Sequence, residues 1–193
     1  MSCSSTIRAL VCVALAGCGG GQAAVRPDSG PPGPDQLYPL AVGNAWSYDV
    51  DAGEGDTVLA VARVVSVRGA AVEVLSGGGE VLRYERRTDG IYRPHKSGYL
   101  LKAPVRAGQT WQSANGVTAE VSRIVDVLET PAGRFEGCVE VHESGLRGGQ
   151  HVETTYCPGV GPTRVVSRMD VRGRSLRVVA ELRGYAVGPP AAE

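Results

Sequence analysis

The sequence predicts an all-β protein, with a single antiparallel, strongly curved sheet or open barrel-like domain that follows a signal helix and a flexible tether. Short apolar stretches alternate with Gly-rich turns across 37–187, a spacing typical of antiparallel strands rather than βαβ units. Valine occurs 28 times, and no segment after residue 36 keeps helical spacing over a dozen positions. About ten strands in roughly 150 residues favour a curved sheet, an open barrel or a sandwich.

The first 17 residues have the pattern of an export signal. Arg8 precedes the apolar run Ala9–Ala16, whose 8 residues are too few to cross a bilayer about 30 Å thick as a helix. A short apolar run followed by small residues indicates a signal peptide, 1–17. The run ends in Leu-Ala-Gly-Cys at residues 15–18, which resembles the bacterial lipobox. The alternatives are an ordinary signal peptide with a chance cysteine and a buried core helix.

The lipobox resemblance implies cleavage before Cys18, a diacylglycerol on the Cys18 thiol and an acyl chain, such as palmitate, on the new amino terminus. Two or three chains on one residue give a stable anchor. Gly19, in place of Asp, implies the outer membrane by the enteric sorting pattern. Residues 18–36 are rich in Gly and Pro and are expected to form the tether, and 188–193 a loose tail.

The charge balance excludes one class of partner. Removing 1–17 takes one basic side chain, Arg8, from a chain with 20 basic and 20 acidic residues, which leaves a formal charge of −1. Without a basic surplus, no nucleic-acid partner is expected. No later apolar segment of the sequence is long enough to span a membrane as a helix.

Individual strands follow from the alternation of apolar and polar residues. The stretch Thr57–Val67 is apolar on both faces apart from Arg63, so it is expected to be central in the sheet. In Ser175–Arg183 the pattern alternates and predicts one face in water. The other expected strands are 45–51, 71–75, 80–86, 91–94, 99–103, 117–128, 135–144, 150–157 and 163–169.

A hairpin register follows from the turn Gly145–Gly149. If the turn is centred between residues 147 and 148, three pairs are directly opposed: Cys138 and Cys157, Val139 and Tyr156, His142 and Glu153. Opposed Cα atoms lie about 4.5–5.5 Å apart, which suits a disulfide. We therefore predict a structural Cys138–Cys157 bridge, stabilising by about 3 kcal/mol. Cys3 and Cys12 leave with the signal peptide.

The same register predicts the two faces of this hairpin. Its polar face would carry Cys138, Glu140, His142, Glu153, Thr155 and Cys157. Its core face would carry Val139, Val141, Val152 and Tyr156. A cross-strand contact between His142 and Glu153 on a wet surface is the favoured interpretation of these two side chains.

No motif indicates catalysis. The histidines are His95, His142 and His151, and no HxH, HExxH or CxxC spacing occurs, so no metal site is expected. No Gly-x-Ser-x-Gly elbow is present. Gly159-Val160-Gly161 lies between two prolines with no helix after it, which favours a turn over a phosphate loop. We expect no enzyme activity, no catalytic residue and no cofactor.

One string occurs twice. PLAVGNAWSY at 39–48 and PVRAGQTWQS at 104–113 place Pro, Gly and Trp in register, 65 residues apart. The tryptophans could form an aromatic binding face, but a corner that drives a core Trp into a strand is the favoured interpretation. We therefore predict that Trp46 and Trp111 are both mostly buried and that each begins a strand. The offset suggests two related β-meanders.

Three motifs in order resemble a group of poorly characterised bacterial lipoproteins and secreted β domains. They are PLAVGNAWSY at 39–48, PAGRFEGC at 131–138 and YCPGVG at 156–161. The resemblance covers about 37–185 and implies a curved sheet similar to that of periplasmic lipoprotein carriers, although likeness of fold does not carry function. Cys157 stands where the group's pattern has Ala, so the disulfide would occur in only a subset of that group.

Together these features predict a membrane-anchored envelope lipoprotein that binds rather than catalyses. The leading expectation is an apolar or amphipathic ligand, such as a lipid, on the concave face of the sheet. The alternative is a non-catalytic scaffold or assembly partner in an envelope protein complex, which predicts an exposed apolar patch or an unpaired edge strand. A hydrolase ranks last because no set of titratable residues stands out.

Overall fold

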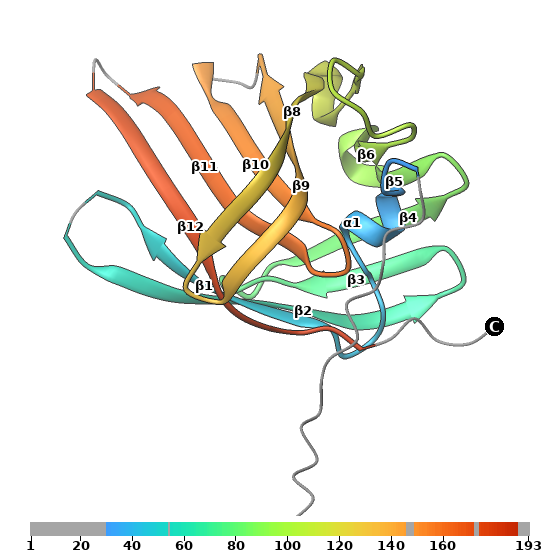
Figure 1. Cartoon of the computed structure of the whole chain (residues 1–193), viewed down its shortest axis with the longest axis horizontal. Helices are drawn as coiled ribbons and strands as arrows, with labels where there is room; N and C mark the ends of the chain where they lie inside the picture. Colours follow the sequence, from blue (N-terminus) through green and yellow to red (C-terminus); the bar gives the residue numbers. More distant parts are fainter. Residues whose placement is uncertain (1–29, 54, 146–148, 172–173, 189–193) are drawn as a thin grey trace, which may run out of the picture.

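The computed structural model describes residues 30–53, 55–145, 149–171 and 174–188, and it is all-β as predicted. One 12-stranded antiparallel sheet curls into a nearly closed barrel with one unsealed seam (Figure 1). The strands are β1 (Ala45–Asp51), β2 (Thr57–Arg68), β3 (Ala71–Leu75), β4 (Val81–Arg87), β5 (Gly90–Arg93), β6 (Gly98–Lys102), β7 (Thr110–Gln112), β8 (Thr118–Thr130), β9 (Gly133–Ser144), β10 (His151–Cys157), β11 (Gly161–Val171) and β12 (Arg174–Ala186).

The sheet consists of two meanders of six strands each. Its order is β6-β5-β4-β3-β2-β1-β12-β11-β10-β9-β8-β7, so β1–β6 and β7–β12 are each consecutive neighbours. The meanders join through β1 and β12, whose ladder runs from Ala45 opposite Ala186 to Asp51 opposite Val179. The two-meander arrangement suggested by the repeated string is therefore the topology of the sheet. The outer strands β6 and β7 meet at the seam.

A single turn of helix, α1 (Pro34–Leu37), lies against the barrel beside β5 (Figure 1). The turn after β10 holds it, because Gly159 N donates to Gln36 O at 2.7 Å. Leu37 is fully buried, and the ring of Tyr38 lies 5.2 Å from that of Trp46. The helix begins three residues before 37, the start of the domain expected from the sequence. The described helices, which include the 3-10 turns Pro94–Lys96 and Ala114–Gly116, include none able to span a membrane.

The interior of the barrel is filled by side chains from both meanders. Tyr38 is the centre of an aromatic group, with Tyr84 and Tyr156 at ring distances of 5.9 and 6.4 Å. Burial raises the pKa values of Tyr38, Tyr84 and Tyr156 above the ordinary range, since a phenolate would lose its hydration there. These tyrosines are therefore neutral packing groups at physiological pH.

The strand predictions agree with the structure except in three respects. The short strand β7 was not among the expected ranges, because three residues carry too little alternation to be recognised. β2 lies between β1 and β3, as expected of a central strand, but Leu59 and Val61 on it are 58% and 41% exposed, so its two apolar faces are not both covered. On β12 the alternation predicts one covered face from Leu176 to Leu182, and Leu182 is buried, whereas Leu176, near the start of the strand, is 42% exposed.

Candidate functional site

The predicted disulfide joins β9 to β10. Cys138 and Cys157 are bonded, with Cα atoms 4.2 Å apart. The predicted register is confirmed, because Val139 faces Tyr156 and His142 faces Glu153. The predicted position of the bridge on a wet face is wrong, since the cysteines are 0% and 1% exposed. Neighbouring strands of the curled sheet surround it: Val125 of β8 lies opposite Cys138, and the Thr163 hydroxyl of β11 lies 3.2 Å from the Cys157 sulfur.

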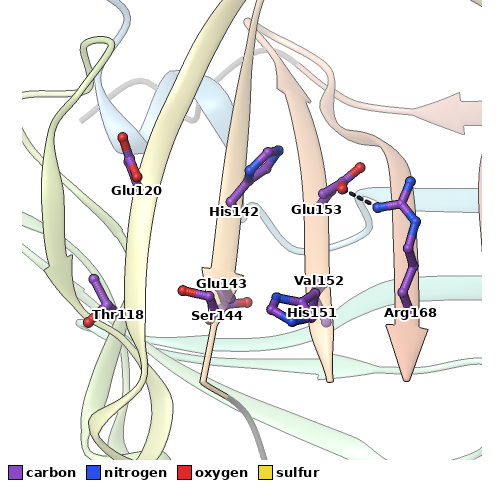
Figure 2. A pocket seen from close by; sticks show the side chains of 9 residues that line it. All are labelled: Thr118, Glu120, His142, Glu143, Ser144, His151, Val152, Glu153 and Arg168. Atoms are coloured by element: carbon purple, nitrogen blue, oxygen red, sulfur yellow. Dashed lines mark hydrogen bonds and ion pairs between the residues drawn. The ribbon is translucent and has the colours of Figure 1, made fainter. Parts of the chain in front are cut away.

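The other half of the hairpin borders an open hollow of about 390 Å³ on the outside of the sheet (Figure 2). Four adjacent strands supply its lining: Thr118 and Glu120 from β8, His142, Glu143 and Ser144 from β9, His151, Val152 and Glu153 from β10, and Arg168 from β11. Eight of the nine residues that line it have polar or charged side chains, and Val152 is the exception. Such a hollow suits water and small polar groups rather than an apolar ligand.

The contact predicted between His142 and Glu153 does not form. His142 Nε2 lies 3.1 Å from Glu140 Oε1, two residues along the same strand and on the same face. Glu153 instead pairs with Arg168 of β11 (Figure 2). A directly opposed position allows a contact but does not require it, and each side chain has a carboxylate or guanidinium nearby on the same face. Glu143, the next residue along β9, points to the opposite face from His142, as strand alternation requires, and pairs inward with Arg93.

Glu140 is the most strongly held carboxylate of this outer face. Arg123 donates to it through Nε at 3.0 Å and Nη2 at 2.9 Å, and Ser122 Oγ donates at 3.0 Å. The hydrogen bond from Arg123 is the main reason that the pKa of Glu140 is lowered, and partial burial opposes it. The carboxylate is therefore ionised and occupied by its own neighbours.

The described residues contain no group of three or more His, Cys, Asp or Glu side chains arranged to hold a metal ion. His95 is exposed in a 3-10 turn, and His151 is exposed at the rim of the hollow. Cys18, the predicted lipidation site, lies outside the described residues. The absence of enzyme activity and of a cofactor thus stays a prediction from the sequence.

The outer face of β2–β4 carries a cluster of exposed apolar side chains, which we call the outer apolar patch. Its members are Leu59 and Val61 of β2, Leu75 of β3 and Val81 of β4, with exposed fractions of 58%, 41%, 40% and 37%. Leu75 lies directly opposite Val81. The alternate residues Val64, Val72 and Val74 are buried in the core, so strand alternation points the patch outward.

Arg63 lies among these apolar side chains, and the Arg83–Glu73 ion pair borders them on the same face. Arg63 is the register partner of Leu75, two residues from Val61 on the same face of β2. Exposed apolar clusters are a feature of interaction sites, and arginine is enriched among the residues that dominate protein–protein binding energy. The sequence contained the signal for the patch, a β2 stretch apolar on both faces, but that pattern was interpreted only as a central position in the sheet. Only the fold shows that nothing in the described chain covers the outer face.

Comparisons with known proteins give a limited result. No family model matches the chain, and no curated protein matches it. Among solved structures, one from Bacteroides fragilis, titled a "putative exported protein with YmcC-like fold", is 14% identical with a TM-score of 0.45, over 77% of this chain and 98% of that one. A "putative lipoprotein" from Parabacteroides distasonis is 12% identical with a TM-score of 0.42, over 78% and 98%. Because both TM-scores are below 0.5, the function proposed below rests on this chain's own residues.

Proposed function

We propose that this chain is an exported, lipid-anchored envelope protein that acts without catalysis, as an assembly partner of another envelope protein. The Leu-Ala-Gly-Cys string at 15–18 and the Gly/Pro-rich segment after it support the anchor and the tether. The single observation that supports the binding role is the outer apolar patch, since exposed apolar clusters are a feature of interaction sites. Its partner would present apolar side chains around a carboxylate that pairs with Arg63.

The packed interior is the reason for preferring this role to that of a ligand carrier. Tyr38, Tyr84 and Tyr156 occupy the space that an apolar ligand would need. The surface hollows of about 390 and 350 Å³ are lined by charged or polar side chains, with one valine in each. Binding of an apolar or amphipathic ligand on the concave face stays a prediction, and it would require these tyrosines to move.

The anchor is tested with the full chain and its Cys18→Ser variant. The mature wild-type chain should have the mass of residues 18–193 plus diacylglycerol and an acyl chain, and it should sediment with the membranes. The variant should lack the lipid mass and appear in the soluble envelope fraction. A wild-type chain that is cleaved elsewhere, or that carries no lipid, would contradict this part of the proposal.

The binding role is tested with two matched substitutions. Val61 in the patch and Val127 on β8 are 41% and 42% exposed, so Val61→Asp and Val127→Asp introduce the same charge at equal exposure. In native gels of gently solubilised envelopes, the wild-type and Val127→Asp chains should run as one discrete complex larger than the monomer. Val61→Asp should run as a monomer. A wild-type chain that is itself monomeric would refute an assembly role, and a small apolar molecule retained by that monomer in native mass spectrometry would favour the ligand carrier.

A further inference from the structure

The two meanders are joined very differently on their two sides. At β1 and β12 a backbone ladder continues over the whole of β1. At the seam, β6 and β7 are the terminal strands of the sheet, and in the described ranges no ladder pairs one with the other. The barrel is therefore closed at the seam by side chains and by one close backbone approach.

Most of the side-chain contacts across the seam centre on Arg93. The side chain of Arg93, at the end of β5, reaches Glu143 on β9, with Nη2 and Oε1 2.6 Å apart. Ser113, just after β7, hydrogen-bonds to both of these side chains. The same Nη2 also lies 3.4 Å from Tyr99 O on the edge strand β6. One guanidinium thus connects strands of both meanders; we call the group Arg93, Ser113 and Glu143 the seam cluster.

Two further contacts hold the edges together. Trp111 on β7 donates its indole N–H to the same Tyr99 carbonyl at 3.2 Å. Gly98 on β6 packs against the backbone of Ser113 so closely that a Cβ there would lie 1.9 Å from Ser113 O. The seam is therefore tightly packed, but its edges exchange side-chain bonds in place of the backbone bonds found elsewhere in the sheet.

The seam cluster is buried but incompletely satisfied. The side chains of Arg93 and Glu143 are 13% and 12% exposed, and Ser113 is fully buried. Arg93 Nε is buried and has no hydrogen-bond partner among the described atoms. A buried N–H without a partner is costly, and water would satisfy it if the seam opened. The closed state is thus held by a strong ion pair and at the same time opposed by an unpaired donor.

We propose that the seam cluster is a latch, and that the two meanders part at the seam while the β1–β12 ladder stays intact. Removing one partner of a buried ion pair leaves the other charge buried without compensation. Opening of the seam would let water hydrate that charge, so the loss of either partner favours the open state. Opening would free the edges of β6 and β7 and give access to Tyr84 and Tyr156 behind them. This inference is independent of the outer apolar patch, which lies on β2–β4.

Hydrogen exchange of the full chain tests the latch. The Arg93→Met and Glu143→Gln variants each remove one charge of the pair. Exchange at 98–102 and 110–112 should rise about tenfold or more in each, because local opening sets the exchange rate. Exchange in β1 and β12 should change less than about twofold, since the ladder between them does not open. An equal rise in all strands, or no rise at β6 and β7, would overturn the proposal.

A double variant separates a latch from general damage to the fold. Arg93→Met/Glu143→Met removes both charges, and apolar replacement of a whole buried pair is often neutral, so exchange at the seam should return to within about threefold of wild type. Exchange as high as in the single variants would overturn the latch. The control is the exposed pair Arg83–Glu73 of the same meander, whose Arg83→Met and Glu73→Gln variants should leave the seam unchanged. If the Arg93 and Glu143 variants do not fold, Ser113→Ala provides the milder test, with a rise of about threefold confined to β6 and β7.

Discussion

The chain builds the same corner twice, once before β1 and once before β7. In the first corner, Gly43 N donates to Val64 O at 3.1 Å and Val64 N donates back to Asn44 O at 2.8 Å. In the second, Gly108 N donates to Val121 O at 2.8 Å and Val121 N donates to Gln109 O at 2.9 Å. Gly43 and Gly108 both have positive φ, at 90° and 79°, as the turn requires. The repeated string therefore encodes a repeated backbone geometry.

Beyond the turn, the surroundings of the two corners differ. Trp46 is 1% exposed and enters β1, which has strand neighbours on both sides. Trp111 is 5% exposed and enters β7, a three-residue strand at the edge of the sheet. Trp46 donates to Val160 O at 2.6 Å in the turn after the disulfide-linked β10, whereas Trp111 donates to Tyr99 O on the other edge strand.

This comparison shows that one local signal serves two purposes. Gly and Trp at this spacing make the same corner in both places in this chain, because the glycine permits the turn and the tryptophan supplies a large apolar anchor. The first corner anchors the junction between the meanders, and the second closes the seam. We expect the first to be the more sensitive to substitution, and four predictions follow from the largest expected effect to the smallest.

The largest effects are expected for the tryptophans themselves. Trp46→Ala should lower the free energy of unfolding by about 4 kcal/mol and Trp111→Ala by about 3 kcal/mol, because the edge site can relax around the cavity more easily. Urea denaturation followed by far-UV circular dichroism measures both. Trp46→Phe and Trp111→Phe, which keep a ring but lose the indole N–H, serve as controls. An equal or larger loss for Trp111→Ala would contradict the ranking of the two corners.

The disulfide should contribute to the greater stability cost expected for substitutions in the first corner. The Cys138→Ala/Cys157→Ala variant should be less stable by about 3 kcal/mol, the value for a loop of this length. Since Cys157 comes three residues before the Val160 carbonyl that Trp46 contacts, Trp46→Ala should cost less in this background than in the wild type. The effect of Trp111→Ala should be unchanged. If Trp46→Ala costs the same with and without the disulfide, the bridge and the first corner are energetically independent.

Two glycines of one turn allow the first corner to be tested sterically. A Cβ on Gly161 would lie 2.8 Å from Trp46 Nε1, whereas a Cβ on Gly159 would meet nothing within 4 Å. Both have positive φ, so both substitutions bring backbone strain. Gly161→Ala should therefore cost about 2 kcal/mol and Gly159→Ala about 1 kcal/mol in thermal or urea unfolding. Equal costs would show that Trp46 moves aside freely.

The smallest effects are expected at the polar residue of each corner. Asn44 is 3% exposed, donates to Pro39 O at 2.7 Å and accepts from Gly188 N at 3.1 Å. Gln109 makes a single exposed bond, to Thr110 O at 3.3 Å. Asn44→Ala should cost about 1 to 1.5 kcal/mol, because it removes both hydrogen bonds of a buried side chain and leaves the partly buried Pro39 carbonyl without its donor, and Gln109→Ala should cost less than about 0.5 kcal/mol. A cost for Gln109→Ala equal to that for Asn44→Ala would contradict this.

Much of the fold could be predicted from local pattern. Alternation located eleven strands, and the symmetric turn gave the register that brings Cys138 and Cys157 together. Burial of Trp46 and Trp111 followed from the corner motif. The errors occurred where side-chain environment depends on distant strands: His142 contacts Glu140 rather than Glu153, and the disulfide is enclosed by residues of β8 and β11.

The candidate sites were less predictable than the fold. The lipobox at 15–18 can be recognised in the sequence because export signals are linear. In the sequence, the outer apolar patch was visible only as a run of apolar residues in β2. The sequence does not say which face of such a strand is covered, so it could not show that this face is exposed. The seam cluster gave no sequence signal, because Arg93, Ser113 and Glu143 are 20 to 50 residues apart and meet only across the seam.

The sequence by itself determined the class of fold, the strands, one hairpin register, the disulfide pairing and the two corners. Each of these depends on residues close in the chain, where turn geometry and the two-residue period of a strand leave few alternatives. Only the tertiary structure decided which face of β2 stays exposed, how the disulfide is buried and how the barrel is closed. Those outcomes depend on how far the sheet curls, because curling sets which distant strands come into contact.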